Sequence, residues 1–143
     1  MDELDVRISE LFMGSDRLNC AQTMMSLSLE MRGETNHGLI KALGGLGGGF
    51  QCRKSCGTLL GGCCLIAGYG AKGQIGEEES FAYKPLVTAL AGWFEEEFGS
   101  TDCKDLVDAD DRLAVMDFCP TLLKKTFAKC MQLLEDAGID PTE

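Results

Sequence analysis

The cysteines are the residues through which this sequence could do chemistry. The chain of 143 residues contains eight of them. Four fall where a helix is expected to begin, at its cap or in its first turn: Cys20, Cys56, Cys103 and Cys119. A helix N-terminus carries about half a positive charge and unpaired N–H groups, and both favour a thiolate over a thiol. Because the thiolate attacks disulfides and binds metals, these positions predict thiol redox chemistry or a metal site.

The other four cysteines have different surroundings. Cys63 and Cys64 lie in an apolar run, and Cys130 lies on the apolar face of the last predicted helix. We expect these three to pack as small hydrophobic side chains, since free cysteine is among the most buried residue types. Cys52 is followed by two basic residues and stands in a C-x3-C pair with Cys56. That pair fits a resolving partner for Cys56 and fits accidental proximity equally well.

Other site chemistries find little support in the sequence. The glycine run at 44–49 fails the dinucleotide-binding fingerprint, because Phe50 stands at its last glycine position and no strand precedes it. We expect either a tight loop with glycine helix caps or a loop that lets backbone lie close to a thiol site. The sequence has no C-x2-C pair for zinc, and its single histidine, His37, lies in the turn-like segment TNHG.

Charge and hydropathy narrow the class of protein. The formal net charge is −10, which disfavours nucleic acids and anionic membranes as partners, because both attract basic surfaces. The first residues are acidic and amphipathic, unlike a targeting segment, and the longest apolar stretches are too short to span a bilayer. We therefore expect no membrane insertion and a cytoplasmic location, where thiols stay reduced and serve metal or redox chemistry.

The elements that must position the cysteines are predicted to be helices. Apolar residues recur at helical spacing through nearly the whole chain, and no segment alternates as a strand does. Ser55 is expected to cap the helix after the glycine run, and Pro120 to occupy the first turn of the last helix. The predicted helical ranges are 4–12, 15–33, 36–43, 56–69, 80–98, 100–107, 110–118 and 119–138. Residues 1–143 are expected to form a single domain, an all-α compact bundle of about five to seven helices.

The order of these segments resembles the family of redox-active proteins named for its C_GCAxxG_C_C cysteine pattern. NCAQTM supplies Cys20, the glycine run and the helix after it supply Cys56, FEEEFGSTDCKDLV supplies Cys103, and CPTLLKKTFAKCMQLLEDAG supplies Cys119. The similarity runs nearly from end to end. Thr58 is a departure, because the family usually has alanine there. Its hydroxyl needs a hydrogen-bond partner, which a backbone carbonyl or a site ligand would supply.

The resemblance implies a redox role, and the first hypothesis for that role is thiol–disulfide chemistry. The four cysteines of the pattern would converge and cycle between dithiol and disulfide, as in a thiol–disulfide oxidoreductase. Cys56 would attack and a second cysteine would resolve the mixed disulfide. Gly57 and Gly61 would let a cofactor, backbone groups or neighbouring helices approach closely. The expected partner is a redox protein or a small oxidant or thiol.

A metal centre is the alternative, with the same four cysteines binding zinc or an iron–sulfur cluster in an electron-transfer protein. Helix N-termini would offset the negative charge of four thiolates. The ligands would come from four distant segments, which is less common than the short local spacings of most such sites. A third possibility is a helical interaction domain whose cysteines are incidental.

Overall fold

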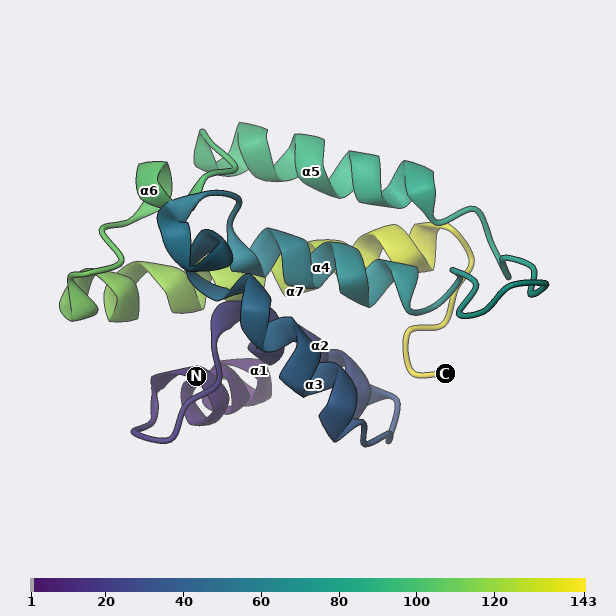
Figure 1. Cartoon of the computed structure of the whole chain (residues 1–143), viewed down its shortest axis with the longest axis horizontal. Helices are drawn as coiled ribbons and strands as arrows, with labels where there is room; N and C mark the ends of the chain where they lie inside the picture. Colours follow the sequence, from purple (N-terminus) through teal and green to yellow (C-terminus); the bar gives the residue numbers. More distant parts are fainter. Residues whose placement is uncertain (1) are drawn as a thin grey trace.

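The computed structural model describes residues 2–143 and shows the all-α protein that the spacing predicts (Figure 1). Within that range the only β-type pairing is an isolated antiparallel bridge between Ser55 and Asp102. A π-helical turn at Ser9–Met13 continues the first helix. The α-helices of the described residues are α1 Glu3–Ile8, α2 Cys20–Met31, α3 His37–Leu43, α4 Gly57–Ala67, α5 Lys84–Phe98, α6 Cys103–Leu106 and α7 Arg112–Asp136.

Helix α4 lies at the centre of the bundle and packs against α2, α5 and α7 (Figure 1). Its sequence GTLLGGCCLIA is apolar on every side, which is typical of a helix that is buried all round. A Cβ on Gly61 would come within 2.9 Å of the Ala21 backbone in α2. One on Gly62 would come within 3.2 Å of the Cys130 sulfur in α7. These glycines therefore allow the close helix contacts that hold the bundle together.

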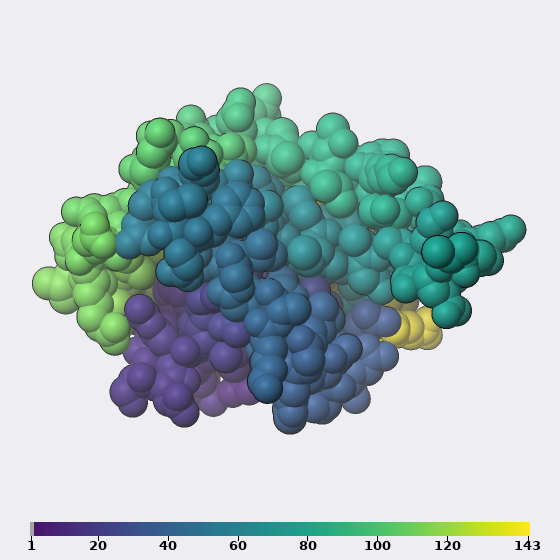
Figure 2. Space-filling model, in the orientation of Figure 1, coloured from purple at the N-terminus to yellow at the C-terminus, as the bar shows by residue number. Residues whose placement is uncertain are grey.

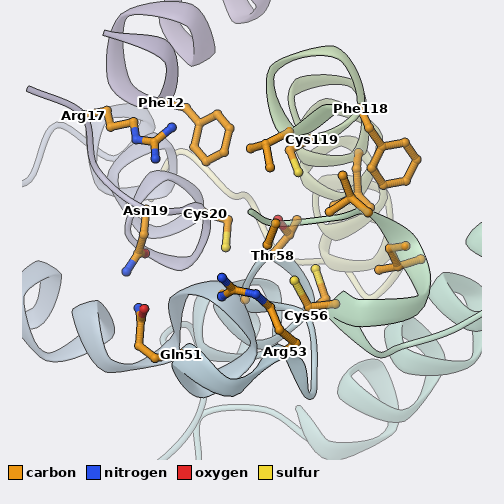
Figure 3. A pocket seen from close by; sticks show the side chains of 18 of the residues that line it. Phe12, Arg17, Asn19, Cys20, Gln51, Arg53, Cys56, Thr58, Phe118 and Cys119 are labelled. Carbon is orange, nitrogen blue, oxygen red and sulfur yellow. The ribbon is translucent and has the colours of Figure 1, made fainter. Parts of the chain in front are cut away.

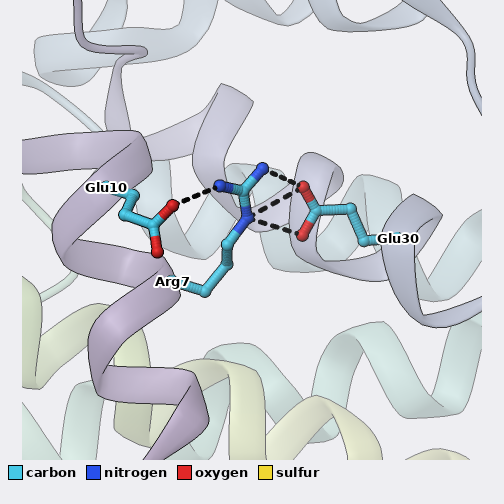
Figure 4. A network of polar contacts seen from close by, with 3 residues as sticks. All are labelled: Arg7, Glu10 and Glu30. Carbon is cyan, nitrogen blue, oxygen red and sulfur yellow. Dashed lines mark hydrogen bonds and ion pairs between the residues drawn. The ribbon is translucent and has the colours of Figure 1, made fainter.

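Helix α1 is joined to α2 by a polar network at the surface (Figure 4). The Arg7 guanidinium donates from Nε to both carboxylate oxygens of Glu30, at 3.0 and 2.9 Å, and from Nη1 to Glu10 at 3.0 Å. Exposed ion pairs of this kind contribute little to stability, so the network mainly orients α1 on α2.

Helix α7 corrects the expectation that the last helix begins at Cys119. It starts at Arg112, where the Asp111 carboxylate accepts hydrogen bonds from the Leu113 and Ala114 amides at 3.1 and 3.2 Å. It then continues through Pro120 to Asp136. A proline inside a helix removes a hydrogen bond and costs about 3 kcal/mol. Burial of the apolar side chains along α7 offsets that cost, and Leu123, for example, is fully buried.

Three segments that are distant in the sequence meet on the face shown in Figure 2. The glycine-rich loop of residues 44–56 lies between the residues before α2 and the chain around α6. This junction contains the cavity described below. No helix among residues 2–143 is long and apolar enough to cross a membrane.

Candidate functional site

The four cysteines of the sequence pattern line one cavity of about 460 Å³. Each comes from a different segment: Cys20 from α2, Cys56 from the cap of α4, Cys103 from α6 and Cys119 from α7. Figure 3 shows the labelled Cys20, Cys56 and Cys119 side chains directed toward the same space. Cys56 and Cys103 are 7% and 8% exposed, whereas Cys20 and Cys119 are half-buried. The fold thus gathers thiols that lie up to about a hundred residues apart.

Cys20 is held by the cap of α2 and by the glycine-rich loop. The Asn19 side chain accepts a hydrogen bond from the Gln22 amide at 2.9 Å and donates to the Gly44 carbonyl at 3.0 Å. The Gln22 side chain accepts from the Asn19 amide at 3.0 Å, which completes a capping box. A Cβ on Gly57 would overlap the Cys20 sulfur. The first turns of α2 and α4 therefore touch at this thiol.

Cys56 and Cys103 are positioned by backbone hydrogen bonds around the Ser55–Asp102 bridge. The Cys56 amide donates to the Thr101 carbonyl at 2.8 Å, and the Cys103 amide donates to the Lys54 carbonyl at 2.7 Å. Ser55 is thereby paired rather than capping α4, which corrects the expectation for that residue. Cys56 itself occupies the N-cap position, with no side-chain capping bond. Two buried thiols are fixed together by this short pairing.

The expectation that helix ends lower the thiol pKa values is wrong for three of the four cysteines. Burial raises the pKa of Cys56 to about 12, and a negative charge on Cys20 adds to the rise. Burial likewise raises the pKa of Cys119 to about 12, with additions from its three cysteine neighbours. Burial and then the charge of Cys20 raise the pKa of Cys103. Loss of hydration outweighs the helix N-termini at Cys56 and Cys103, and Cys119 lies inside α7 and not at a helix end, so these three residues are neutral thiols near neutral pH.

Thr58 contacts the site through its hydroxyl. The polar hydrogens of the Leu59 and Thr58 backbone amides and of the Thr58 hydroxyl favour the Cys56 thiolate, and they partly oppose the effect of burial on its pKa. The Thr58 side chain is 1% exposed. The residue that departs from the family pattern therefore lies against a cysteine of that pattern.

The remaining cysteines lie outside the cavity lining. Cys130 is fully buried against α4, and Cys63 and Cys64 pack partly buried against the core. Burial raises the pKa of Cys63 to about 11 and also raises the pKa of Cys64. Cys52 is exposed, and its thiol donates to the Gly49 carbonyl at 3.4 Å. All eight cysteines are free thiols.

Of the other predicted residues, Gly57 lines the cavity and Gly61 lies at the contact between α4 and α2. His37 is exposed at the start of α3. Within residues 2–143, no three or more histidine, cysteine or acidic side chains are arranged to hold a metal ion.

Sequence reasoning missed two arginines of the cavity, Arg17 and Arg112, and assigned the third, Arg53, to the surroundings of Cys52. Two of the three share a spacing that could have revealed them: Arg17 precedes Cys20 by three residues, and Arg53 precedes Cys56 by three. The Arg53 charge opposes the rise in the pKa of Cys103, and the Arg17 charge opposes that of Cys119.

A strained loop carries Arg53 into the site. Phe50, Gln51 and Arg53 have left-handed backbone conformations, with φ of 61°, 59° and 66°. Such conformations cost non-glycine residues about 1 kcal/mol or more each and cluster at functional sites. The Lys54 amide closes the loop by donating to the Gly49 carbonyl at 3.0 Å.

Comparison with known proteins gives one finding. The family model described as Putative redox-active protein (C_GCAxxG_C_C) matches residues 18–137. No curated protein and no solved structure matches the chain. The family match includes all four cavity cysteines and most of the chain. The protein therefore belongs to the C_GCAxxG_C_C family of redox-active proteins.

Proposed function

We propose that this protein is a thiol–disulfide exchange protein that stores electron pairs in its cavity cysteines. The observation that carries the proposal is that four free thiols from four separate segments line one cavity. Thiols that share a cavity are placed for exchange with a small disulfide and then with one another. Four of them have the capacity for two disulfides.

Cys20 is the attacking residue in this proposal, in place of Cys56. Cys20 is half-buried, whereas Cys56 is 7% exposed and has its pKa raised to about 12 by burial. Cys20 also stands at the first position of the 12-residue helix α2, where its sulfur touches the first turn of α4. Its thiolate attacks one sulfur of a disulfide R–S–S–R. A Cys20–S–R bond forms, the original S–S bond breaks, and R–S⁻ leaves with the electron pair and takes up a proton.

Cys56 resolves the mixed disulfide. The Cys20 sulfur contacts Gly57, the next residue after Cys56, so the two cysteines are neighbours. The charge of Cys20 contributes to the raised pKa of Cys56, and that contribution disappears when Cys20 enters a mixed disulfide. The Cys56 thiolate then attacks the Cys20 sulfur and expels the second R–S⁻. The protein has lost two electrons and two protons, and the substrate has become two R–SH.

Thiol titration of the unfolded protein tests the proposal. Protein purified without oxygen and treated with increasing 2-hydroxyethyl disulfide should lose free thiols in steps of two, from eight toward four. Cys20→Ser should abolish the first step, and Cys63→Ala, which changes a thiol outside the cavity lining, should retain it. Loss of single thiols, or no loss at all, would contradict the exchange mechanism. Stoichiometric zinc or iron, with a visible band for iron, would support the metal alternative instead.

A further inference from the structure

The cavity carries a positive charge in a strongly acidic protein. Its charged lining residues are three arginines, Arg17, Arg53 and Arg112, and one acid, Asp110. Those side chains give the cavity lining a net charge of about +2, whereas the whole chain has a formal net charge of −10. A cleft with one sign of charge and low-dielectric walls concentrates ions of the opposite sign.

The three arginines differ in how they are held. Arg53 Nη2 pairs with the Asp110 carboxylate at 2.9 Å, and its charge acts on Cys103; Figure 3 shows its side chain on the same side of the cavity as Cys56. Arg17 and Arg112 are exposed, and neither forms an ion pair with any residue in 2–143. Two guanidinium groups in the lining of the cysteine cavity, one of which acts on Cys119, are thus free to bind an incoming anion.

The rest of the lining suits a small molecule. Phe12, Phe118 and Leu122 supply apolar walls, and the volume of about 460 Å³ lies within the usual range for small-ligand pockets. Guanidinium groups bind carboxylates through paired N–H donors, which lysine cannot do.

We infer that the cysteine cavity selects small disulfides that carry carboxylate groups, with Arg17 and Arg112 of the cavity lining binding the carboxylates. This inference rests on the proposed exchange function and identifies its substrate class. The same cations favour the chemical step, because negative charge passes from the Cys20 sulfur to the leaving sulfur of the substrate. The bonds made and broken, and the two electrons and two protons transferred, are those of the exchange given above.

A charge series of small disulfides tests the inference on the intact protein. The probes are 3,3′-dithiodipropionate, which is anionic, 2-hydroxyethyl disulfide, which is neutral, and cystamine, which is cationic. The rate of thiol loss with each probe is divided by the rate of the same probe with 2-mercaptoethanol, which removes differences in intrinsic reactivity. At low salt the normalised rate should be about tenfold or more higher for the anionic probe than for the neutral one, and lowest for cystamine. At 1 M salt the advantage should shrink, since the Debye length falls to about 3 Å.

Three double variants distinguish the effect of the two arginines on the rate ratio from the effect of the protein's net charge. Arg17→Gln combined with Arg112→Gln should lower the anionic-to-neutral rate ratio by about tenfold. Lys41→Gln combined with Lys72→Gln removes the same charge from exposed positions outside the cavity lining and should preserve the ratio. Arg17→Lys with Arg112→Lys should retain part of the advantage, because the charge remains but the paired donors are lost.

Each outcome decides between the proposals. Equal normalised rates for the three probes with the unaltered protein would overturn the inference and leave thiol exchange standing. No reaction with any of the three probes would overturn the exchange function itself. If the Lys41→Gln, Lys72→Gln variant lost the preference for the anionic probe as fully as the arginine-to-glutamine variant, net charge and not the two arginines would select the substrate.

Discussion

The sulfur of Cys20 fills the space that a Cβ at Gly57 would occupy. This contact joins the first turn of α2 to the first turn of α4, and a Cβ there would also lie 2.8 Å from the Leu46 carbonyl oxygen. Position 57 is therefore restricted to glycine by a site thiol and by the glycine-rich loop together. Glycine is needed at this position because there is no space for a Cβ, and not because the backbone is left-handed.

Gly57→Ala should destabilise the protein. Alanine is the better helix former by about 1 kcal/mol, but overpacking against sulfur and backbone costs about 1–3 kcal/mol and should reverse the sign. The free energy of unfolding, measured with urea under reducing conditions, tests this expectation. Gly92→Ala is the matched control, because Gly92 lies in α5 with nothing within 4 Å of its added Cβ. That variant should gain stability, and equal effects of the two substitutions would contradict the steric argument.

The structure predicts an order of reactivity among the site thiols. With a pKa of about 12, only about one Cys56 in ten thousand is ionised at pH 8. Cys20→Ser should therefore slow the reaction with 2-hydroxyethyl disulfide by at least about tenfold. Cys56→Ser should permit the first step but accumulate the Cys20 mixed disulfide, which mass spectrometry detects as an adduct on the peptide containing Cys20.

Cys130→Ser provides the control for these two variants. Cys130 is fully buried and lies outside the cavity lining, so a serine hydroxyl there should cost about 1–3 kcal/mol of stability without changing thiol reactivity. If Cys56→Ser removed the fastest-reacting thiol and Cys20→Ser did not, the assignment of attacking and resolving residues would be reversed.

The raised thiol pKa values also predict how stability depends on pH. An unfolded cysteine loses its proton near its ordinary pKa of about 8.5, whereas folded Cys56 keeps its proton until its pKa of about 12. Between these values the unfolded state binds fewer protons than the folded state, so stability falls as pH rises. Each such thiol lowers the free energy of unfolding by at most about 1.4 kcal/mol for each pH unit in this range. The free energy of unfolding is measured with urea at pH 8 and pH 10 under reducing conditions. It should fall less between these pH values in Cys56→Ser than in the unaltered protein, and an equal fall in both would contradict the role of burial.

Local sequence patterns predicted much of the fold but not the chemistry of the buried thiols. Capping residues and helical spacing located most helices. The family resemblance identified four cysteines that do share a cavity, although Cys119 lies inside α7 and not at the helix start that was expected. The break expected between the predicted helices 110–118 and 119–138 did not occur, because the cap at Asp111 and burial along α7 favour one continuous helix. The thiolate expectation was wrong for Cys56, Cys103 and Cys119, because burial depends on segments that the local sequence does not contain.

Thr58 offers a test of the resolving step, because its hydroxyl favours the Cys56 thiolate where the family usually has alanine. Thr58→Ala should raise the pKa of Cys56 further and slow resolution of the Cys20 mixed disulfide. One lost hydrogen bond to a charged group is worth about 1.5 kcal/mol, which corresponds to a rate effect of about tenfold. Thr58→Ser keeps the hydroxyl and should resolve at close to the original rate. The lifetime of the adduct after one equivalent of disulfide, followed by quenching and mass spectrometry, measures the step. Equal lifetimes in the alanine and serine variants would show that the hydroxyl plays no part, and that packing alone accounts for threonine at this position.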